Sequence, residues 1–491
     1  MTAGHTVELA DARPDSVDEA VGFVTGMLGR AVEKGRTSAE DAAAAAERLV
    51  PLRSPLAPGG GVDLVVEAVL EDLAVKTELF TGLEKVLPAS AVFATNTSSL
   101  SVTRIAAGLA DPTRLAGLHF FNPVPLMRIA EVIPGAATRP AVVPFLVDLV
   151  EKSGHRAVVV ADTPGFLVNH AGRGLITEAL ALLEEDVADA AGIDRIARDV
   201  LGLRMGPFEL TDLTGLDVTA SVIDTVWKGF RHSERLRPSY LTPNRVAAGL
   251  HGRKTGRGFY DYGPDAPGTP AEPPVTGDAS RPVHVPGDAD AHDVRRALRA
   301  VGAVLDEGAR PGERAVVLVP VWGTTVAAAV AELGLPAGRT LGVDPLSLDT
   351  RRRVLAMTPA CDTDAVRDAR AVLARSGDAP MPVSVSVVRD TAGSVAQRLL
   401  ASIVSVAASI AERAIAAPTD IDLAVTTGLG YPHGPLAWGD RTGAARMLAL
   451  HRALYGTTGD PRYRPTRWVT ERAQLGLPLT EAGAAPPHAA V

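Results

Sequence analysis

The sequence predicts a chain of two fold classes in alternation, an α/β segment followed by an all-α segment, with a weaker copy of both after them. Three observations support this prediction. Short apolar runs alternate with helical patterns over residues 1–160, which is typical of a doubly wound sheet. The pattern then changes to helices alone, and a second helical stretch repeats the first at a constant offset along the chain.

The first segment, residues 1–160, is expected to hold a parallel or mixed sheet covered by helices. Two stretches are expected to be helices, VDEAVGFVTGMLGRAVEKG and SAEDAAAAAERLV. The expected strands are HTVELAD, VDLVVEAV, AVFATNTS, RLAGLHFF and HRAVVVAD.

A helical domain is expected over residues 161–262, closing near GRGFYDY. Asp162 and Thr163 are candidate helix caps, and Pro164 suits the first helical turn. The density of prolines over residues 263–288 predicts a stiff linker without regular structure. Strand and helix patterns return over residues 289–385, where AVVLVPVW is the clearest strand; a second helical domain over 386–479 and a tail over 480–491 complete the chain.

The two helical domains are interpreted as a duplication. VVADTPG at 159–165 aligns with VVRDTAG at 387–393, and the same offset relates the pairs Ile193-Asp194 and Ile421-Asp422, Gly206-Pro207 and Gly434-Pro435, and the triplets Asp212, Thr214, Gly215 and Asp440, Thr442, Gly443. Asn169 of the first copy aligns with Gln397 of the second, so the copies differ at a position that is a candidate for chemistry.

Composition excludes several classes of protein. A net charge of -8 and the lack of a basic run argue against nucleic acid as a partner. Cys361 is the single cysteine, which excludes an intramolecular disulfide and a cysteine-based metal cluster and fits a reducing compartment. The N-terminus has no pattern of a secretory signal, and the apolar run Leu399–Ala411 is shorter than the ~20 residues a bilayer requires. We therefore expect a cytoplasmic protein with no membrane partner and no metal.

Four polar residues stand in apolar surroundings: Ser98, His119, Glu131 and Asn169. Singly, each is more simply a core or solvated residue. Together they suggest catalysis, because a histidine base benefits from a carboxylate that orients its ring, and Ser and Asn can bind a substrate oxygen. The turn NPVP lies between two predicted strands and would return Glu131 toward His119.

Several motifs resemble the 3-hydroxyacyl-CoA dehydrogenases in order and spacing, across about residues 4–262. They are NTSSLS, GLHFFNPVP, the glutamate of RIAEVIPG, DTPGFLVN, GPFELTDLTGLD and GRKTGRGFYDY. The tandem layout is similar to that of the long bacterial members, which include enzymes of phenylacetate degradation. The resemblance implies NAD as cofactor, an acyl-CoA substrate, and a dehydrogenase reaction of fatty acid β-oxidation or of phenylacetate degradation.

The resemblance also implies roles for individual residues. His119 would take the proton of the substrate 3-hydroxyl, Glu131 would orient it, and Ser98 and Asn169 would hold the substrate. Positions that would contact or lie near NAD are Glu71, Lys76, Asn122, Lys254 and Asp11, the last on the adenosine ribose. Without the resemblance, Glu71, Lys76 and Lys254 would equally well be solvated surface charges.

A Rossmann-like domain is expected to begin with a strand and a GxGxxG loop that binds the pyrophosphate, and neither is found in this sequence. Gly59–Gly61 precede a strand, so they are interpreted as a linker turn, and AVVLVPVWGTTVAAAV is interpreted as a decayed relic of such a loop. The first strand either lies upstream, has been lost, or is donated by residues 290–385; retention of the four polar residues favours the first of these.

The functional prediction is NAD-dependent oxidation of a 3-hydroxyacyl-CoA, such as 3-hydroxybutyryl-CoA or 3-hydroxyadipyl-CoA, to the 3-oxoacyl-CoA. The alternative is an N-terminally truncated, inactive acyl-CoA-binding or dimerisation protein. The resemblance further implies dimer contacts through the helical domain, as a homodimer or as an intramolecular pseudo-dimer formed by the two copies.

Overall fold

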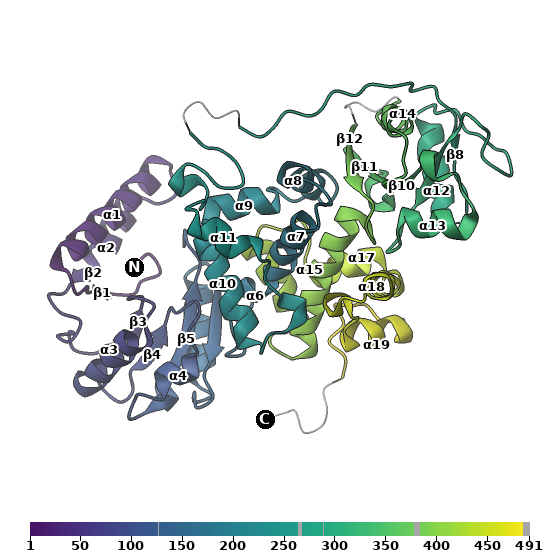
Figure 1. The fold of residues 1–491 in the computed structure, drawn as a ribbon. Coiled ribbons are helices and arrows are strands. Elements are labelled where there is room, and N and C mark those ends of the chain that lie inside the picture. The colour runs from purple at the N-terminus through teal and green to yellow at the C-terminus, as the bar shows by residue number, and fades with distance from the viewer. Residues whose placement is uncertain (126, 264–267, 288, 378–382, 485–491) are drawn as a thin grey trace. The chain divides into compact units, whose positions relative to one another are not determined.

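The computed structural model describes residues 1–125, 127–263, 268–287, 289–377 and 383–484. The chain divides into two compact units, Met1–Phe166 and Leu167–Val491. Figure 1 traces both, and each is described below by itself.

The first unit contains alternating strands and helices. Its strands are β1 (Val7–Leu9), β2 (Leu49–Pro51), β3 (Leu64–Glu67), β4 (Val92–Thr95), β5 (Leu115–Phe120), β6 (Ile129–Pro134) and β7 (Arg156–Val159). Its helices are α1 (Pro14–Glu33), α2 (Ala39–Glu47), α3 (Leu73–Val86), α4 (Val102–Ala106) and α5 (Val142–Lys152).

The strands of the first unit form two separate sheets. One has five strands in the order β3-β4-β5-β6-β7, parallel except for the antiparallel pair β5 and β6. The other is the parallel pair β1 and β2. Apolar side chains of α5, Val142, Leu146 and Val150, pack on the larger sheet to form its core, because these residues follow helical spacing along one face.

Asp162 does not begin a helix, so the predicted caps and first turn at 162–164 are wrong. The next helix begins at Val168. Asp162 instead accepts hydrogen bonds from the backbone N–H groups of Val102 and Thr103 and from the Ser101 hydroxyl, at 2.8–3.0 Å. The carboxylate therefore caps α4, an element that lies far earlier in the chain, since the first N–H groups of a helix lack partners within it.

The helices of the second unit come from both predicted helical domains. The first set is α6 (Val168–Ala171), α7 (Arg173–Glu184), α8 (Ala190–Asp199), α9 (Pro207–Thr214), α10 (Leu216–Gly229) and α11 (Leu241–Ala247). The second set is α15 (Ser394–Glu412), α16 (Pro418–Gly428), α17 (Pro435–Thr442), α18 (Ala444–Thr458) and α19 (Arg467–Leu475).

The two sets repeat the same local contacts. Asp194 accepts the N–H groups of Phe208 and Glu209, and Asp422, at the aligned position of the second copy, accepts those of Leu436 and Ala437. A Cβ on Gly206 or on Gly434 would lie 2.3 Å from the side chain of the corresponding aspartate, so both sites require glycine. These matched contacts are the structural counterpart of the repeated sequence.

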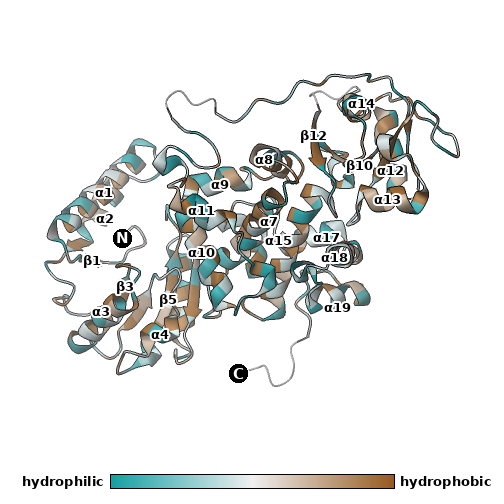
Figure 2. Cartoon of the chain, viewed as in Figure 1, coloured by the Kyte–Doolittle hydropathy of each residue, from teal (hydrophilic) through white to brown (hydrophobic). Residues whose placement is uncertain are grey.

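Helix α15 lies at the centre of the second unit's helices (Figure 1). By length and composition it is apolar enough to cross a membrane, but 89% of its apolar window is buried inside the protein, as is typical of a core helix. Apolar residues also dominate strand β5 (Figure 2).

Residues of the predicted second α/β segment form a sheet of their own, in the order β12-β11-β10-β9-β8. Its strands are β8 (Val283–His284), β9 (Val316–Pro320), β10 (Thr340–Val343), β11 (Arg352–Met357) and β12 (Ser384–Arg389), and its helices are α12 (Ala289–Ala300), α13 (Val326–Leu333) and α14 (Thr363–Leu373). The hypothesis that residues 290–385 donate a strand to the first unit is therefore wrong for the described strands.

Strand β8 lies within the predicted proline-rich linker, so residues 283 and 284 correct that prediction. They are buried and pair with β9, because the last prolines of the stretch leave room for two ladder residues. From 268 to 282 the described chain has neither helix nor strand. Parts of three predicted segments, residues 264–267 and 288, 378–382, and 485–491, lie outside the described residues.

The loop Val321–Thr325 was interpreted as a relic of the pyrophosphate loop, and the structure corrects this. Asp390 accepts the N–H groups of Val326 and Ala327 at the start of α13, as Asp162 does at the start of α4. Strand β10 is parallel to β9 and antiparallel to β11, as β5 is to β4 and β6. The loop is therefore the counterpart of NTSSLS and not of a pyrophosphate loop.

Candidate active site

The antiparallel pairing of β5 and β6 places His119 directly opposite Glu131. Nδ1 of His119 lies 2.6 Å from Oε2 of Glu131, and both side chains are buried. Residues that are paired across neighbouring strands point to the same face of a sheet, so the two side chains can meet. The chain between them consists of the end of β5, a turn and the start of β6. A carboxylate at Nδ1 leaves Nε2 as the ring nitrogen available to a substrate.

Aromatic rings surround the histidine. The ring centroid of Phe121 lies 4.4 Å from that of His119 in an edge contact, and that of Phe166 lies 5.8 Å away. His119 is 5% exposed and Glu131 is fully buried. The apolar rings reduce the local dielectric, which strengthens the interaction between Glu131 and a protonated His119.

Ser98 lies on the exposed loop after β4, and Glu71 organises this loop. Oε1 of Glu71 accepts hydrogen bonds from the N–H groups of Ser98 and Ser99, both at 2.9 Å, and from the hydroxyls of Thr97, Ser98 and Ser99. Burial alone would raise the pKa of Glu71, but the hydrogen bonds from Thr97, Ser99 and Ser98 and the nearby Lys76 lower it to about 2.

Lys76 is a buried residue and not a solvated surface charge. Its Nζ lies 2.5 Å from Oε1 of Glu67 and 3.3 Å from Oε2 of Glu71. The other oxygen of Glu67 accepts the hydroxyl of Thr95 on β4. Lys76 thus links α3 to the ends of β3 and β4. The sequence did not reveal this role, because the lysine and its glutamate partners come together only when the chain folds.

The remaining predicted residues are distributed over both units. Asp11 is exposed just after β1 and accepts the N–H of Arg13 at 2.8 Å, while Asn122 is exposed in the loop after β5. In the second unit, Asn169 is half-buried on α6, and Lys254 forms an ion pair with Asp217 at 2.5 Å. The first unit therefore brings together His119 and Glu131, and separately Ser98, Glu71 and Lys76.

The second sheet lacks this set of polar residues at the corresponding positions. From the strand pairings, Trp322 takes the place of Ser98, Asp344 that of His119 and Val354 that of Glu131. Gln397, in place of Asn169, donates to Asp344 at 2.8 Å and accepts the N–H of Gly323. The resemblance of GVD at 342–344 to GLH at 117–119 is the sequence signal that would have located this counterpart.

A doubly wound sheet with a buried histidine and carboxylate at its strand ends, followed by a helical domain, defines a nicotinamide-dependent dehydrogenase of the Rossmann-like class. The comparisons with known proteins agree with this class. Residues 1–163 match the family of 3-hydroxyacyl-CoA dehydrogenase, NAD binding domain. Residues 165–262 and 393–485 match the family of 3-hydroxyacyl-CoA dehydrogenase, C-terminal domain.

Individual relatives support the match over almost the whole chain. The chain is 34% identical to 3-hydroxyadipyl-CoA dehydrogenase of Escherichia coli over 96% of its length and 93% of the relative. It is 37% identical to a probable 3-hydroxybutyryl-CoA dehydrogenase of Bacillus subtilis, over 53% of this chain and 90% of that one. The crystal structure of an Escherichia coli 3-hydroxybutyryl-CoA dehydrogenase superimposes with a TM-score of 0.82, covering 96% of this chain and 94% of that one at 33% identity.

The chain belongs to the 3-hydroxyacyl-CoA dehydrogenase family and is an NAD-dependent oxidoreductase of that family. Both matched stretches of the helical domain confirm that this domain occurs twice.

Proposed function

We propose that His119, oriented by Glu131, is the base with which this enzyme oxidises a 3-hydroxyacyl-CoA to the 3-oxoacyl-CoA. The observation that supports this role is the 2.6 Å contact between Nδ1 of His119 and Oε2 of Glu131 in a buried, aromatic setting. Nε2 takes the proton of the 3-hydroxyl, the C–H pair of electrons at C3 leaves as hydride, and the C3–O bond becomes a carbonyl. Glu131 stabilises the imidazolium that results.

Further residues are proposed to position the substrate. The Ser98 hydroxyl is held in an exposed loop by Glu71, and the Asn169 amide is carried by α6 of the second unit. Both are proposed to hydrogen-bond the substrate. A substrate held in this way has already lost part of its freedom on binding, so it loses less entropy when it reaches the reactive geometry.

NAD supplies the hydride acceptor when it is bound. The described residues fit part of this cofactor: Asp11 presents an exposed carboxylate after β1, where an acid binds ribose hydroxyls. The exposed Val66, Val69 and Leu70, at and after β3, provide uncovered apolar surface near the strand ends. Asn122 and Lys254 are proposed to lie near the cofactor, and Glu71 and Lys76 to support it through the loop that they fix.

We propose that β1 and β3 belong to one sheet and that the described residues leave a strand position between them unfilled. The support for this proposal is that β1 pairs only with β2 and β3 only with β4, and that Val66 on β3 is 47% exposed. A strand in that position, followed by a glycine-rich loop, would complete the sheet and offer N–H groups to the pyrophosphate.

Turnover of 3-hydroxybutyryl-CoA with NAD, followed as NADH absorbance, tests the proposed base. We expect His119→Ala to lower kcat by about 10²–10⁴-fold with little change in KM, because the proton acceptor is lost while binding groups remain. Glu131→Gln should also lower kcat, since the amide cannot stabilise the imidazolium. The exposed His292→Ala variant on α12 serves as the matched control and should retain full activity.

The alternative is that the chain binds acyl-CoA without catalysing its oxidation. In that case the unmodified chain and His119→Ala would show the same absence of hydride transfer and the same affinity for acyl-CoA. A difference in turnover between them excludes this alternative.

We also propose the domain boundaries 1–160, 161–262, 289–385 and 386–479, and a cytoplasmic location, which the single free thiol of Cys361 supports.

The two helical copies are proposed to pair within one chain. Arg398 on α15 forms a 2.6 Å ion pair with Glu178 on α7, and the Tyr463 hydroxyl donates to the same carboxylate at 2.7 Å. The Arg235 guanidinium, from the first copy, likewise donates to the Ser405 hydroxyl of the second.

A further inference from the structure

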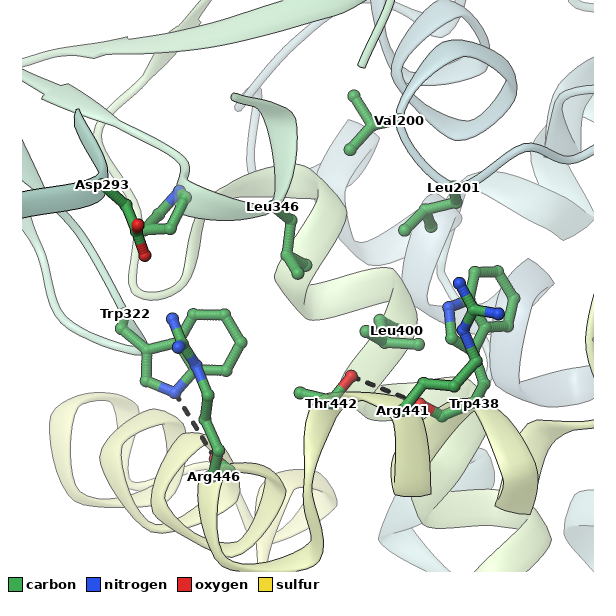
Figure 3. Close-up of a pocket in the computed structure, with 11 residues that line it drawn as sticks. Val200, Leu201, Asp293, Trp322, Leu346, Leu400, Trp438, Arg441, Thr442 and Arg446 are labelled. Atoms are coloured by element: carbon green, nitrogen blue, oxygen red, sulfur yellow. Dashed lines mark hydrogen bonds between the residues drawn. The ribbon is translucent and has the colours of Figure 1, made fainter. Parts of the chain in front are cut away.

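A cavity of about 320 Å³ lies in the second unit, at the strand ends of the sheet in which Asp344 takes the place of His119. Trp322 and Leu346 reach it from the loops after β9 and β10, Trp438 and Arg441 from α17, and Arg446 from α18. Figure 3 shows the two tryptophans on opposite sides with Leu346 and Leu400 between them. In doubly wound sheets the carboxyl ends of strands are where ligands bind, so the position of the cavity suits a ligand.

The cavity cannot repeat the chemistry of the first sheet. Trp322 stands where Ser98 stands, and Asp344 and Val354 replace the histidine and its carboxylate. Gln397 is bound to Asp344, to the carbonyl of Val321 and to the N–H of Gly323, so its amide is fully used by the protein. A ligand here would be bound without being oxidised.

The side chains around the cavity select for flat rings. Arg446 lies over Trp322 with its Cζ 4.1 Å from the ring centroid, and the Trp322 Nε1 donates to the Arg446 carbonyl. Trp438 is 8% exposed and is held by an edge contact with His433. Rigid indoles on two sides of a space that is lined by both apolar and polar side chains favour stacking on a planar, polar ring over packing of a flexible apolar chain.

The charges around the cavity select for an anion attached to that ring. Arg446 is already paired with Asp290 at 2.8 Å, whereas Arg441 forms no ion pair with a carboxylate among the residues that the structure describes. An exposed, unpaired guanidinium at the edge of an aromatic site is suited to a phosphate. Asp293, on the Trp322 side of the cavity, offers an acceptor for an amino or hydroxyl group (Figure 3).

We propose that this cavity, lined by Trp322, Trp438, Arg441 and Arg446, is a non-catalytic binding site for a nucleotide, with the base between the tryptophans and the phosphates on Arg441. The same chemistry is present in a free adenine nucleotide and in the nucleotide half of coenzyme A. The site is independent of the reaction proposed for His119, because it belongs to the other sheet.

Calorimetric titration of the whole chain with ADP, free coenzyme A or inorganic phosphate tests the site. ADP also resembles part of NAD, so the comparison is between two charge reversals on neighbouring helices: Arg441→Glu at the cavity, and Arg452→Glu, exposed on α18 and outside the cavity. ADP is therefore expected to bind at two classes of site, the NAD site and the cavity. We expect Arg441→Glu to weaken the binding of ADP at the cavity at least about tenfold, and Arg452→Glu to leave binding at both sites unchanged.

Trp322→Leu should also weaken the binding of ADP at the cavity. Turnover of 3-hydroxybutyryl-CoA should stay unchanged in all three variants. Coenzyme A binding at least about tenfold more tightly than ADP would identify the acyl carrier as the source, and equal affinities would identify a free nucleotide. Identical titrations of Arg441→Glu and Arg452→Glu would overturn the proposal. So would inorganic phosphate that binds as tightly as ADP, because the ring would then contribute nothing.

Discussion

Glu71 shows how a single carboxylate fixes the geometry of a neighbouring loop. One of its oxygens accepts two backbone N–H groups and three hydroxyls from residues 97–99, and Ser98 belongs to this set. The family resemblance implied that Glu71 contacts the cofactor. The structure adds that the residue holds the proposed substrate-binding serine in place.

Replacement of Glu71 by Gln should destabilise the protein in a pH-dependent way. Its pKa of about 2 lies below the ordinary value of 4.5, so the carboxylate stabilises the fold above pH 4.5 and loses this effect as the pH falls toward 2. Because the side chain is 35% exposed, we expect a loss of about 1–2 kcal/mol in unfolding free energy at pH 7, after allowance for screening.

Urea denaturation between pH 2 and pH 7 measures this dependence. The difference between the natural chain and Glu71→Gln should shrink steadily below pH 4.5. Glu78→Gln, an exposed substitution on the following helix α3, should show no such trend. An equal difference at all pH values would mean that the hydrogen bonds to the carboxylate contribute nothing to stability.

At the scale of elements, the helices α7 and α15 approach each other closely at Gly174. A Cβ at this position would lie 2.9 Å from the Cα of Ile403 and from the carbonyl oxygen of Ser402, both backbone atoms. Ser402 aligns with Gly174 by the same offset that relates Asp194 to Asp422. Equivalent positions of the two copies therefore meet here, as they do near an axis of pseudo-symmetry. Only glycine fits without moving a helix.

Gly174→Ala should therefore lower the unfolding free energy by about 1–3 kcal/mol, since backbone cannot yield as a side chain can. Gly456→Ala on α18, where a Cβ would meet nothing within 4 Å, is the matched control. It should be neutral or stabilising by up to about 1 kcal/mol, because alanine favours the helix. Equal stabilities of the two variants in urea denaturation would contradict the close contact.

At the scale of the molecule, α7 packs against α15 within one chain, which is the contact on which the proposed intramolecular pseudo-dimer rests. Buried ion pairs of Arg398 with Glu178 and of Arg462 with Glu178 belong to this interface. A pseudo-dimer of this kind would cover the interface within the chain, so the proposal predicts a monomer.

We expect light scattering to give a mass near 50.9 kDa, that of a single chain. Dilution over a hundredfold range should leave this mass unchanged. A stable particle of twice the mass, held through the first helical copy, would show that the copies do not replace an intermolecular interface.

The sequence was sufficient wherever the determining pattern is local or repeated. Two apolar runs joined by the turn NPVP predicted that Glu131 returns toward His119, because a short turn between two strands brings them side by side; the structure adds that the two residues are direct partners. The constant offset between aligned residues predicted the second helical copy, since duplicated contacts such as those of Asp194 and Asp422 preserve their residues.

Only the tertiary structure decided which distant groups meet. Asp162 caps a helix that lies far earlier in the chain, Lys76 is buried between two glutamates, and the loop of Trp322 corresponds to the loop of Ser98 and not to a pyrophosphate loop. Each of these depends on partners from other elements, whose approach is set by packing and by strand order. Local sequence patterns carry no information on such contacts, because a charged or capping side chain looks the same whether it is solvated or paired.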